Sequence, residues 1–189
     1  MKLAFVIYDG LTTLDFAGMF DPLTRLKTMG FVGNLEYDVC ALNSLVLSFE
    51  NLQLIPTKVG GSLEGYDYII IPGGNGIAEQ IKDDAFLSWM KTANPEATMA
   101  AVCGGVIILG VLGLLAGKKA TTHPAMLGYL NNFTPYVVED RIVDEGNIIT
   151  ARGVTSAIDL GLYLCERIAG KEAREHIQKQ MDYLNYDCK

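Results

Sequence analysis

Short, continuous apolar runs alternate with longer segments of helical periodicity along most of this chain. A short run rich in β-branched residues and without polar alternation is typical of a strand covered on both faces, as in a parallel sheet. Such strands are predicted at 2–7, 37–42, 68–71, 98–102 and 119–122, with shorter ones at 136–138, 141–143 and 147–150. The segments 45–49 and 53–55 predict a small hairpin around Glu50-Asn51.

Helical segments fall between these strands. The pair Asp21-Pro22 is typical of an N-cap followed by proline at the first helical position, which predicts a helix from there to Gly30. Further helices are predicted at 84–92, 104–116, 124–130, 154–169 and 171–183. Strands that alternate with helices form βαβ units, so the pattern predicts an α/β fold, a doubly wound and mostly parallel sheet with helices on both faces.

Length and composition narrow the organisation of the chain. Its 189 residues are enough for one sizeable core and too few for two full-sized domains, and no repeat or long linker divides them. We therefore expect a single domain over residues 1–189. The apolar start at 3–7 is too short for a signal-peptide core, and the longest apolar run, 106–116, is broken by glycines and predicts a buried helix instead of a membrane span.

Charge and cysteine usage exclude several classes of function. The net charge of −7, with no basic stripe, makes nucleic acid or an anionic membrane a poor partner. The four cysteines (Cys40, Cys103, Cys165 and Cys188) contain no CxxC pair, which argues against a disulfide framework and a zinc ribbon. Two histidines are too few for most transition-metal sites made by protein alone. We expect a reduced, cytoplasmic protein without a metal or an organic cofactor.

Five unusual features come directly after predicted strands. They are the segments 9–15 and 72–76, Cys103, His123, and the pair Arg152-Gly153. In a doubly wound sheet, ligands bind in the crevice at the carboxyl ends of the strands. If the strands are parallel, the five features lie along one edge, and the sequence predicts a pocket there.

Cys103 stands where a predicted strand turns at once into a helix, and Gly104 and Gly105 follow it. The free N–H groups and the dipole at a helix start favour a thiolate there and are suited to hold an oxyanion. This arrangement has the logic of a nucleophile elbow, with cysteine in the place of serine. The other interpretation is a small buried cysteine at the end of a strand.

The neighbouring features each have two interpretations. The loop 72–76 offers backbone N–H groups for the other half of an oxyanion hole, or it is a tight turn into the next helix. Asp15, among apolar neighbours, is either a buried acid with a raised pKa that shares a proton with Cys103, or a helix N-cap. His123 is either a base or pocket residue beside Cys103, or an imidazole bonded to the backbone.

These motifs together resemble the ThiJ/PfpI superfamily, which has a flavodoxin-like fold of the class I glutamine-amidotransferase type. The resemblance is carried by Asp15 in Leu-Asp-Phe-Ala-Gly, by the Pro72-Gly73-Gly74 loop, by Ala-Val-Cys-Gly-Gly around Cys103, by Ala-Thr-Thr-His up to His123, and by the block 153–162. It extends over nearly the whole chain. The block 153–162 and the aspartate at position 15 are most similar to the isonitrile hydratase (cyclohexyl-isocyanide hydratase) branch.

The resemblance implies roles for the site residues. Cys103 would be the nucleophile that attacks the isonitrile carbon, and Asp15 the acid and base that carries the proton. The backbone of Gly73, Gly74 and Gly104 would cradle the developing charge, and water would release an N-substituted formamide. Members of the superfamily are commonly homodimers, so a homodimer is expected.

Two positions depart from the pattern. The isonitrile hydratase branch usually has threonine directly after the cysteine, where this chain has Gly104, so one hydroxyl is absent. Arg152 stands where a small residue is expected, and we expect it to point into the pocket and to favour a thiolate or an anionic substrate. Three other functions stay open: a glyoxalase or deglycase activity on reactive carbonyls, a redox sensor that oxidises Cys103, or a domain that has lost its chemistry.

Overall fold

The computed structural model describes residues 1–184, so Cys188 lies outside the described residues. A seven-stranded sheet forms its centre, with the strand order β5-β2-β1-β6-β7-β9-β8. The strands are β1 (Lys2–Val6), β2 (Glu36–Ala41), β5 (Lys58–Val59), β6 (Tyr68–Ile71), β7 (Thr98–Val102), β8 (Ile142–Asp144) and β9 (Ile148–Ala151). All neighbouring pairs are parallel except β8 with β9, at one edge of the sheet. The predicted doubly wound fold is confirmed.

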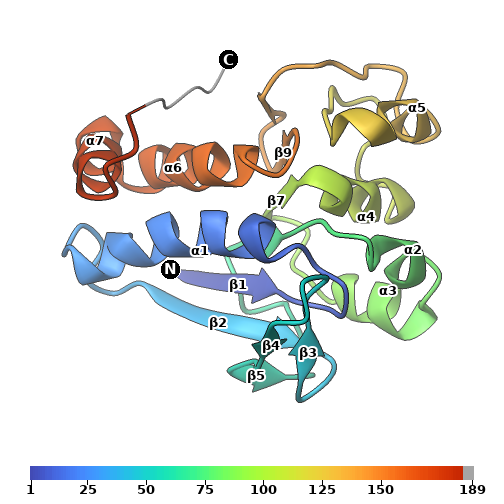
Figure 1. Cartoon of the computed structure of the whole chain (residues 1–189), viewed down its shortest axis with the longest axis horizontal. Coiled ribbons are helices and arrows are strands. Elements are labelled where there is room, and N and C mark those ends of the chain that lie inside the picture. Colours follow the sequence, from blue (N-terminus) through green and yellow to red (C-terminus); the bar gives the residue numbers. More distant parts are fainter. Residues whose placement is uncertain (185–189) are drawn as a thin grey trace.

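Helices cover both faces of the sheet (Figure 1). On one face lie α1 (Thr13–Thr28), α6 (Ser156–Ala169) and α7 (Lys171–Gln180), with α1 packed along α6. The other face is covered mainly by α3 (Asp84–Met90) and α4 (Val106–Val111), and the shorter helices are α2 (Ile77–Gln80) and α5 (Leu127–Leu130). Two 3₁₀ turns, Cys103–Gly105 and Pro124–Met126, precede α4 and α5.

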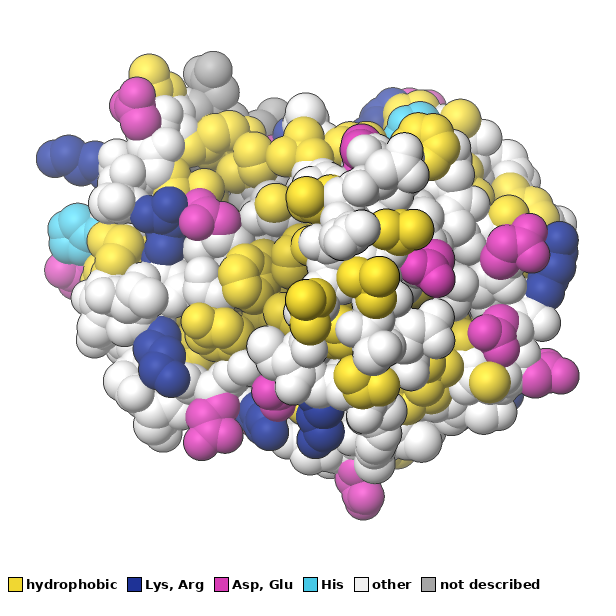
Figure 2. All heavy atoms as spheres, turned by 60° about the horizontal axis from the view of Figure 1, so that its bottom comes forward, with side chains coloured by type: hydrophobic (Ala, Val, Ile, Leu, Met, Phe, Trp, Pro, Cys, Tyr) yellow, Lys and Arg dark blue, Asp and Glu magenta, His cyan; other side chains and the backbone are white. Residues whose placement is uncertain are grey.

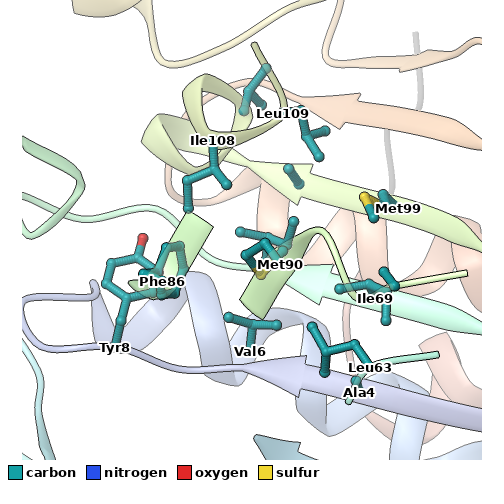
Figure 3. Packing of buried hydrophobic residues seen from close by; sticks show 14 of the residues in the cluster. Ala4, Val6, Tyr8, Leu63, Ile69, Phe86, Met90, Met99, Ile108 and Leu109 are labelled. Atoms are coloured by element: carbon teal, nitrogen blue, oxygen red, sulfur yellow. The ribbon is translucent and has the colours of Figure 1, made fainter. Parts of the chain in front are cut away.

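Each central strand divides its side chains between two cores. Ile69 and Met99 belong to the core beneath α3 and α4, whereas Ile70 and Ala100, their neighbours in the chain, belong to the core beneath α1 and α6. Figure 3 shows the first core, in which side chains from three neighbouring strands gather around Met90 of α3. Burial of a large aliphatic side chain contributes about 1.5–3 kcal/mol, so both faces require apolar residues, and the strands have no polar side.

The predicted start of the first helix is wrong. Helix α1 begins at Thr13, and Pro22 lies inside it. Proline lacks the N–H that would bond to the carbonyl of Gly18, but packing compensates. A Cβ on Gly161 of α6 would lie 2.4 Å from the ring of Pro22, so the two helices meet closely there. This packing buries Met19, Leu23 and Leu26 of α1 completely, which outweighs the local signal for a helix start.

Other differences are local. The predicted strands at 119–122 and 136–138 form only an isolated parallel bridge, between Ala120 and Val137. The predicted helix at 104–116 is shorter, because a 3₁₀ turn occupies its start and Gly113, with a φ of +80°, follows its end. Strand β5 and helix α2 were not predicted, since two and four residues carry no readable periodicity. The hairpin is confirmed as β3 (Val46–Leu47) paired with β4 (Gln53–Leu54).

Within residues 1–184, no helix combines the length and the apolar character that crossing a membrane requires.

Candidate active site

Cys103 follows β7 directly and adopts a left-handed backbone, with a φ of +57°. Residues other than glycine rarely adopt this conformation, and it persists only where the surroundings hold it. The N–H of Cys103 donates to the carbonyl of Arg152 at 2.8 Å, and the hydroxyl of Thr122 donates to the Cys103 carbonyl at 2.6 Å. The predicted sharp turn at Cys103 is confirmed, and hydrogen bonds on both sides fix it.

Glycines let the loop after β6 approach this turn. A Cβ on Gly105 would lie 2.5 Å from the carbonyl oxygen of Pro72. A Cβ on Gly73 would lie 2.5 Å from the nitrogen of Gly104 and 2.8 Å from both Cys103 Cβ and Asp15 Oδ2. Real Cβ contacts are not so short, so these positions require glycine, and the thiol-bearing turn and the acid meet at one point.

Asp15 lies in the first turn of α1 and is fully buried. The N–H of Gly73 donates to its Oδ2 at 3.0 Å, and its carboxyl lies within hydrogen-bond reach of the Cys103 thiol. Burial, with a smaller contribution from the charge of Glu50, raises the pKa of Asp15 to about 7, against the lowering effect of these hydrogen bonds. Thr12, not Asp15, occupies the N-cap position, so the interpretation as a buried acid is the one that agrees with the structure.

The pKa of Cys103 moves opposite to the expectation from its helix start. Burial, followed by the charge of Asp15, raises the pKa of the thiol to about 12, and the hydrogen bond from the N–H of Gly104 offsets only part of this. Burial and the charge of Asp15 therefore act against the thiolate that the helix start favours. Desolvation and a neighbouring carboxylate outweigh one N–H at the start of a 3₁₀ turn. With these pKa values the thiol is the weaker acid of the two groups, and a partly ionised carboxyl lies beside it at neutral pH.

A cavity of about 260 Å³ opens above the thiol. It is lined by Thr12, Gly74, Asn75, Cys103, Gly104, His123, Ala125, Met126 and Val154. The segments after β1, β6, β7 and β9 and the loop that holds His123 thus converge at the carboxyl edge of the sheet, where the sequence predicts a pocket. Of the three glycines expected to cradle charge, Gly74 and Gly104 line this cavity. Gly73 instead directs its N–H to Asp15.

His123 lines the cavity but is not arranged as a base. Its Nδ1 accepts a hydrogen bond from the N–H of Ala125 at 3.2 Å. In the neutral imidazole, the proton is then on Nε2, so the ring offers a donor. The ring also lies against Gly153, where a Cβ would be 3.4 Å from its Cδ2. Both sequence interpretations of His123 are therefore partly right: it bonds to the backbone, and it borders the pocket.

The expectation for the side chain of Arg152 is wrong. Its guanidinium donates to the carboxylate of Glu139 at 2.9 Å and to the carbonyl of the same residue at 2.5 Å. Arg152 is not among the residues that line the cavity. The ion pair with Glu139 holds the positive charge of Arg152 outside the cavity. Only the backbone carbonyl of Arg152 contributes to the site, as the acceptor for the N–H of Cys103.

Sequence reasoning missed two residues near the pair. Tyr8, two residues after the end of β1, donates its hydroxyl to the carbonyl of Pro72 at 2.7 Å. Its pKa is raised first by burial and then by the charges of Asp15 and Cys103. Its place at the end of a strand was the available signal. Glu50 accepts hydrogen bonds from the N–H of Thr13 at 3.0 Å and from its hydroxyl at 2.6 Å. No sequence signal connects the hairpin turn with the start of α1, because only folding brings them together.

The fold and the site define a class of protein: a doubly wound α/β protein with a cysteine on a sharp turn after a central strand and a buried acid beside it. The model of the DJ-1/PfpI family matches residues 1–167, and the chain belongs to this family. The resemblance to the ThiJ/PfpI superfamily is thus confirmed.

Relatives within the family differ in their named activities. The chain is 32% identical over 184 residues to isonitrile hydratase of Pseudomonas putida, an alignment that covers 97% of this chain and 78% of that protein. It is 29% identical over 189 residues to the glutathione-independent glyoxalase DJ-1 of Schizosaccharomyces pombe, with 96% and 98% covered. A solved ThiJ/PfpI family protein from Pseudomonas syringae superposes with a TM-score of 0.86 at 28% identity, covering 97% of this chain and 75% of that one. Family membership alone therefore selects no reaction.

Proposed function

We propose that this protein adds water to small isonitriles by covalent catalysis, with Cys103 as the nucleophile and Asp15 as the acid and base. The observation that carries this proposal is the placing of a buried carboxyl beside a thiol that lines a cavity. The similarity to isonitrile hydratase of Pseudomonas putida, at 32% identity, supports the choice of substrate.

The proposed reaction begins with proton transfer within the pair. The carboxylate of Asp15 takes the thiol proton while the sulfur attacks the terminal carbon of the isonitrile, and the same proton then goes to that carbon. The product is a thioimidate bound to Cys103. Because the pKa of Asp15 is about 7, its carboxyl both accepts and returns a proton at neutral pH.

Water completes the proposed cycle. Its oxygen adds to the thioimidate carbon. One of its hydrogen atoms goes to the nitrogen, and the other goes through Asp15 to the sulfur. The C–S bond then breaks, so that the thiol is regenerated and an N-substituted formamide leaves. The N–H groups of Gly74 and Gly104 and the Nε2–H of His123 are the donors that we assign to charge developing in the cavity.

The test measures formamide formation from a panel of isonitriles by wild type, Cys103→Ser and Asp15→Asn. We expect turnover by wild type only, and a wild-type adduct on Cys103 with the mass of the isonitrile. Cys40→Ala serves as the matched control, because Cys40 is also a buried cysteine but packs against Tyr66 away from the cavity. Turnover that persists in Cys103→Ser would contradict covalent catalysis.

A glyoxalase reaction is the second candidate, and the similarity to glyoxalase DJ-1 of Schizosaccharomyces pombe favours it. Here the thiol would add to the aldehyde carbon of an α-oxoaldehyde to form a hemithioacetal. Asp15 would move a proton from that carbon to its neighbour, and water would release a 2-hydroxy acid from the resulting thioester. Lactate formed from methylglyoxal, with no formamide from any isonitrile, would replace the first candidate by this one. No turnover, with selective oxidation of Cys103 by mild peroxide, would favour a sensor instead.

We further propose that the protein is a cytoplasmic homodimer. Six apolar residues on and beside the β3–β4 hairpin are each exposed by 42% or more, and we call them the hairpin patch: Leu45, Leu47, Phe49, Leu52, Ile55 and Val59. Figure 2 views the molecule from the hairpin side and shows apolar side chains gathered on this face. Such patches mark interaction sites. Light scattering should give twice the mass of one chain, and Phe49→Glu should halve it while Tyr136→Glu, outside the patch, does not.

The cytoplasmic location is supported by the cysteines. The thiols of Cys40, Cys103 and Cys165 are free, as is usual in a reducing compartment.

A further inference from the structure

A second cavity lies beside the one that contains the thiol. It has a volume of about 360 Å³ and is lined by Gly74, Asn75, Ile77, Ala78, Ile81, Met126 and Tyr129. Three of these residues, Gly74, Asn75 and Met126, also line the cavity above Cys103. The two cavities therefore share a wall and lie side by side at the carboxyl edge of the sheet.

Gly104 stands at the junction of the two cavities. A Cβ at this position would lie 3.3 Å from Ile77 Cγ1 and 3.3 Å from Met126 Sδ. Both distances are shorter than ordinary van der Waals contact, so Ile77 and Met126 already close over this position, and a branched side chain here would push them aside. Gly104 has no positive φ, so its backbone does not require glycine. The missing side chain is therefore what lets Ile77 and Met126 keep their places in the lining of the second cavity.

The lining of both cavities determines which ligand fits. Among the lining residues of either cavity there is no aspartate, glutamate, lysine or arginine. The second cavity is bordered mainly by Ile77, Ile81, Met126 and Tyr129. A charged substituent would lose its hydration there without gaining a partner, whereas an alkyl or aryl group would bury apolar surface.

We propose that the two cavities form one binding site, in which Cys103 reacts with the electrophilic carbon and the second cavity binds an uncharged, apolar substituent of several carbons. Gly104 is the specificity-determining residue, because its lack of a side chain preserves the positions of Ile77 and Met126 in the lining. For isonitriles this assignment rests on the proposed function, but it applies to any electrophile that Cys103 attacks. A long substituent extends over Met126, which lines both cavities, toward Tyr129, which lines the second cavity and is 45% exposed.

The experiment uses alkylation of Cys103, which needs no catalytic turnover. N-methyl, N-propyl and N-hexyl iodoacetamide are reacted with the full chain, and the rate at Cys103 is followed by mass spectrometry and divided by the rate with glutathione. Because burial of one methylene is worth about 0.8 kcal/mol when complete, the normalised rate should rise about two- to fourfold per carbon. A hexanoate-tailed iodoacetamide of matched length should lose this gain.

Variants then locate the effect. Gly104→Val should abolish the rise with chain length, and Tyr129→Ser, at an exposed position that spares the core, should reduce it for the hexyl probe. Gly33→Ala is the matched control, since a Cβ at Gly33 meets nothing within 4 Å and this residue lies outside the site. The proposal would be overturned if the rate in wild type did not depend on chain length. It would also be overturned if Gly104→Val and Tyr129→Ser showed the same dependence on chain length as wild type. Length-dependent alkylation without turnover of any isonitrile would support the binding site and overturn the proposed reaction.

Discussion

Replacement of Asp15 by asparagine should stabilise the folded protein above about pH 7 while it removes activity. The pKa of Asp15 rises from its ordinary value of 3.8 to about 7, mainly through burial. Between these two values the folded state binds more protons than the unfolded state, so the free energy of unfolding falls as the pH rises. At about 1.36 kcal/mol per unit, the folded protein loses up to about 4 kcal/mol across this window, and the loss is complete above about pH 7.

Urea unfolding of wild type and Asp15→Asn at about pH 5 and about pH 8 measures this cost. Other titrating groups are common to both proteins and cancel in the difference. Asparagine resembles the protonated carboxyl, and the unfolded carboxyl is already ionised at the lower pH, so the variant should be the more stable by about 1.5 kcal/mol there and by about 4 kcal/mol at the higher pH. Asp21→Asn, on the same helix but exposed and paired with Arg25, should differ from wild type by under about 1 kcal/mol at either pH. A difference for Asp15→Asn that stays constant between the two pH values would refute the burial argument.

Other predictions concern the same site. Turnover by wild type should rise as the pH increases through about 7, because the base is the ionised form of Asp15, and Asp15→Asn should lack this inflection in a pH–rate profile. Glu50→Gln removes a negative charge that raises the pKa of Asp15, so its inflection should move to lower pH; an unchanged inflection would show that Glu50 acts only on Thr13. Gly73→Ala places a Cβ 2.5 Å from the nitrogen of Gly104, so we expect a destabilisation of about 1–3 kcal/mol in urea unfolding and at least a tenfold loss of turnover, neither of which Gly33→Ala should cause.

The strands of the central sheet were predictable because burial on both faces imposes one simple pattern. Residues 68–71 and 98–102 coincide with β6 and β7 as predicted, and their continuous apolarity is what a sheet covered by helices on both sides requires. The start of α1 was not predictable in the same way. Pro22 and Asp21 give a strong local signal for a helix start, but contact of α1 with α6 buries more apolar surface than that signal is worth.

The candidate site, too, could be predicted from the sequence only in part. Cys103, Asp15 and the loop 72–76 could be selected from the sequence, since each follows a strand in the order that a parallel sheet brings to one edge. The directions in which the side chains point could not be predicted from the sequence. Arg152 has the right position in the chain, yet its guanidinium turns to Glu139, a partner in a loop without regular secondary structure.

The sequence by itself determined the order of the helices and strands, the edge of the sheet at which a pocket forms, and the thiol at that pocket. Hydrophobic periodicity and the ends of strands are local properties of the chain. Only the tertiary structure decided the chemistry of the pair. Burial of Asp15 beside Cys103 raises both pKa values, which opposes the effect of the helix start on the thiol. It also decided that an apolar cavity adjoins the one that Cys103 lines, since Ile77 and Met126 meet beside Gly104 from elements far apart in the chain. Desolvation and shape depend on every group packed around a site, and these are known only when the chain is folded.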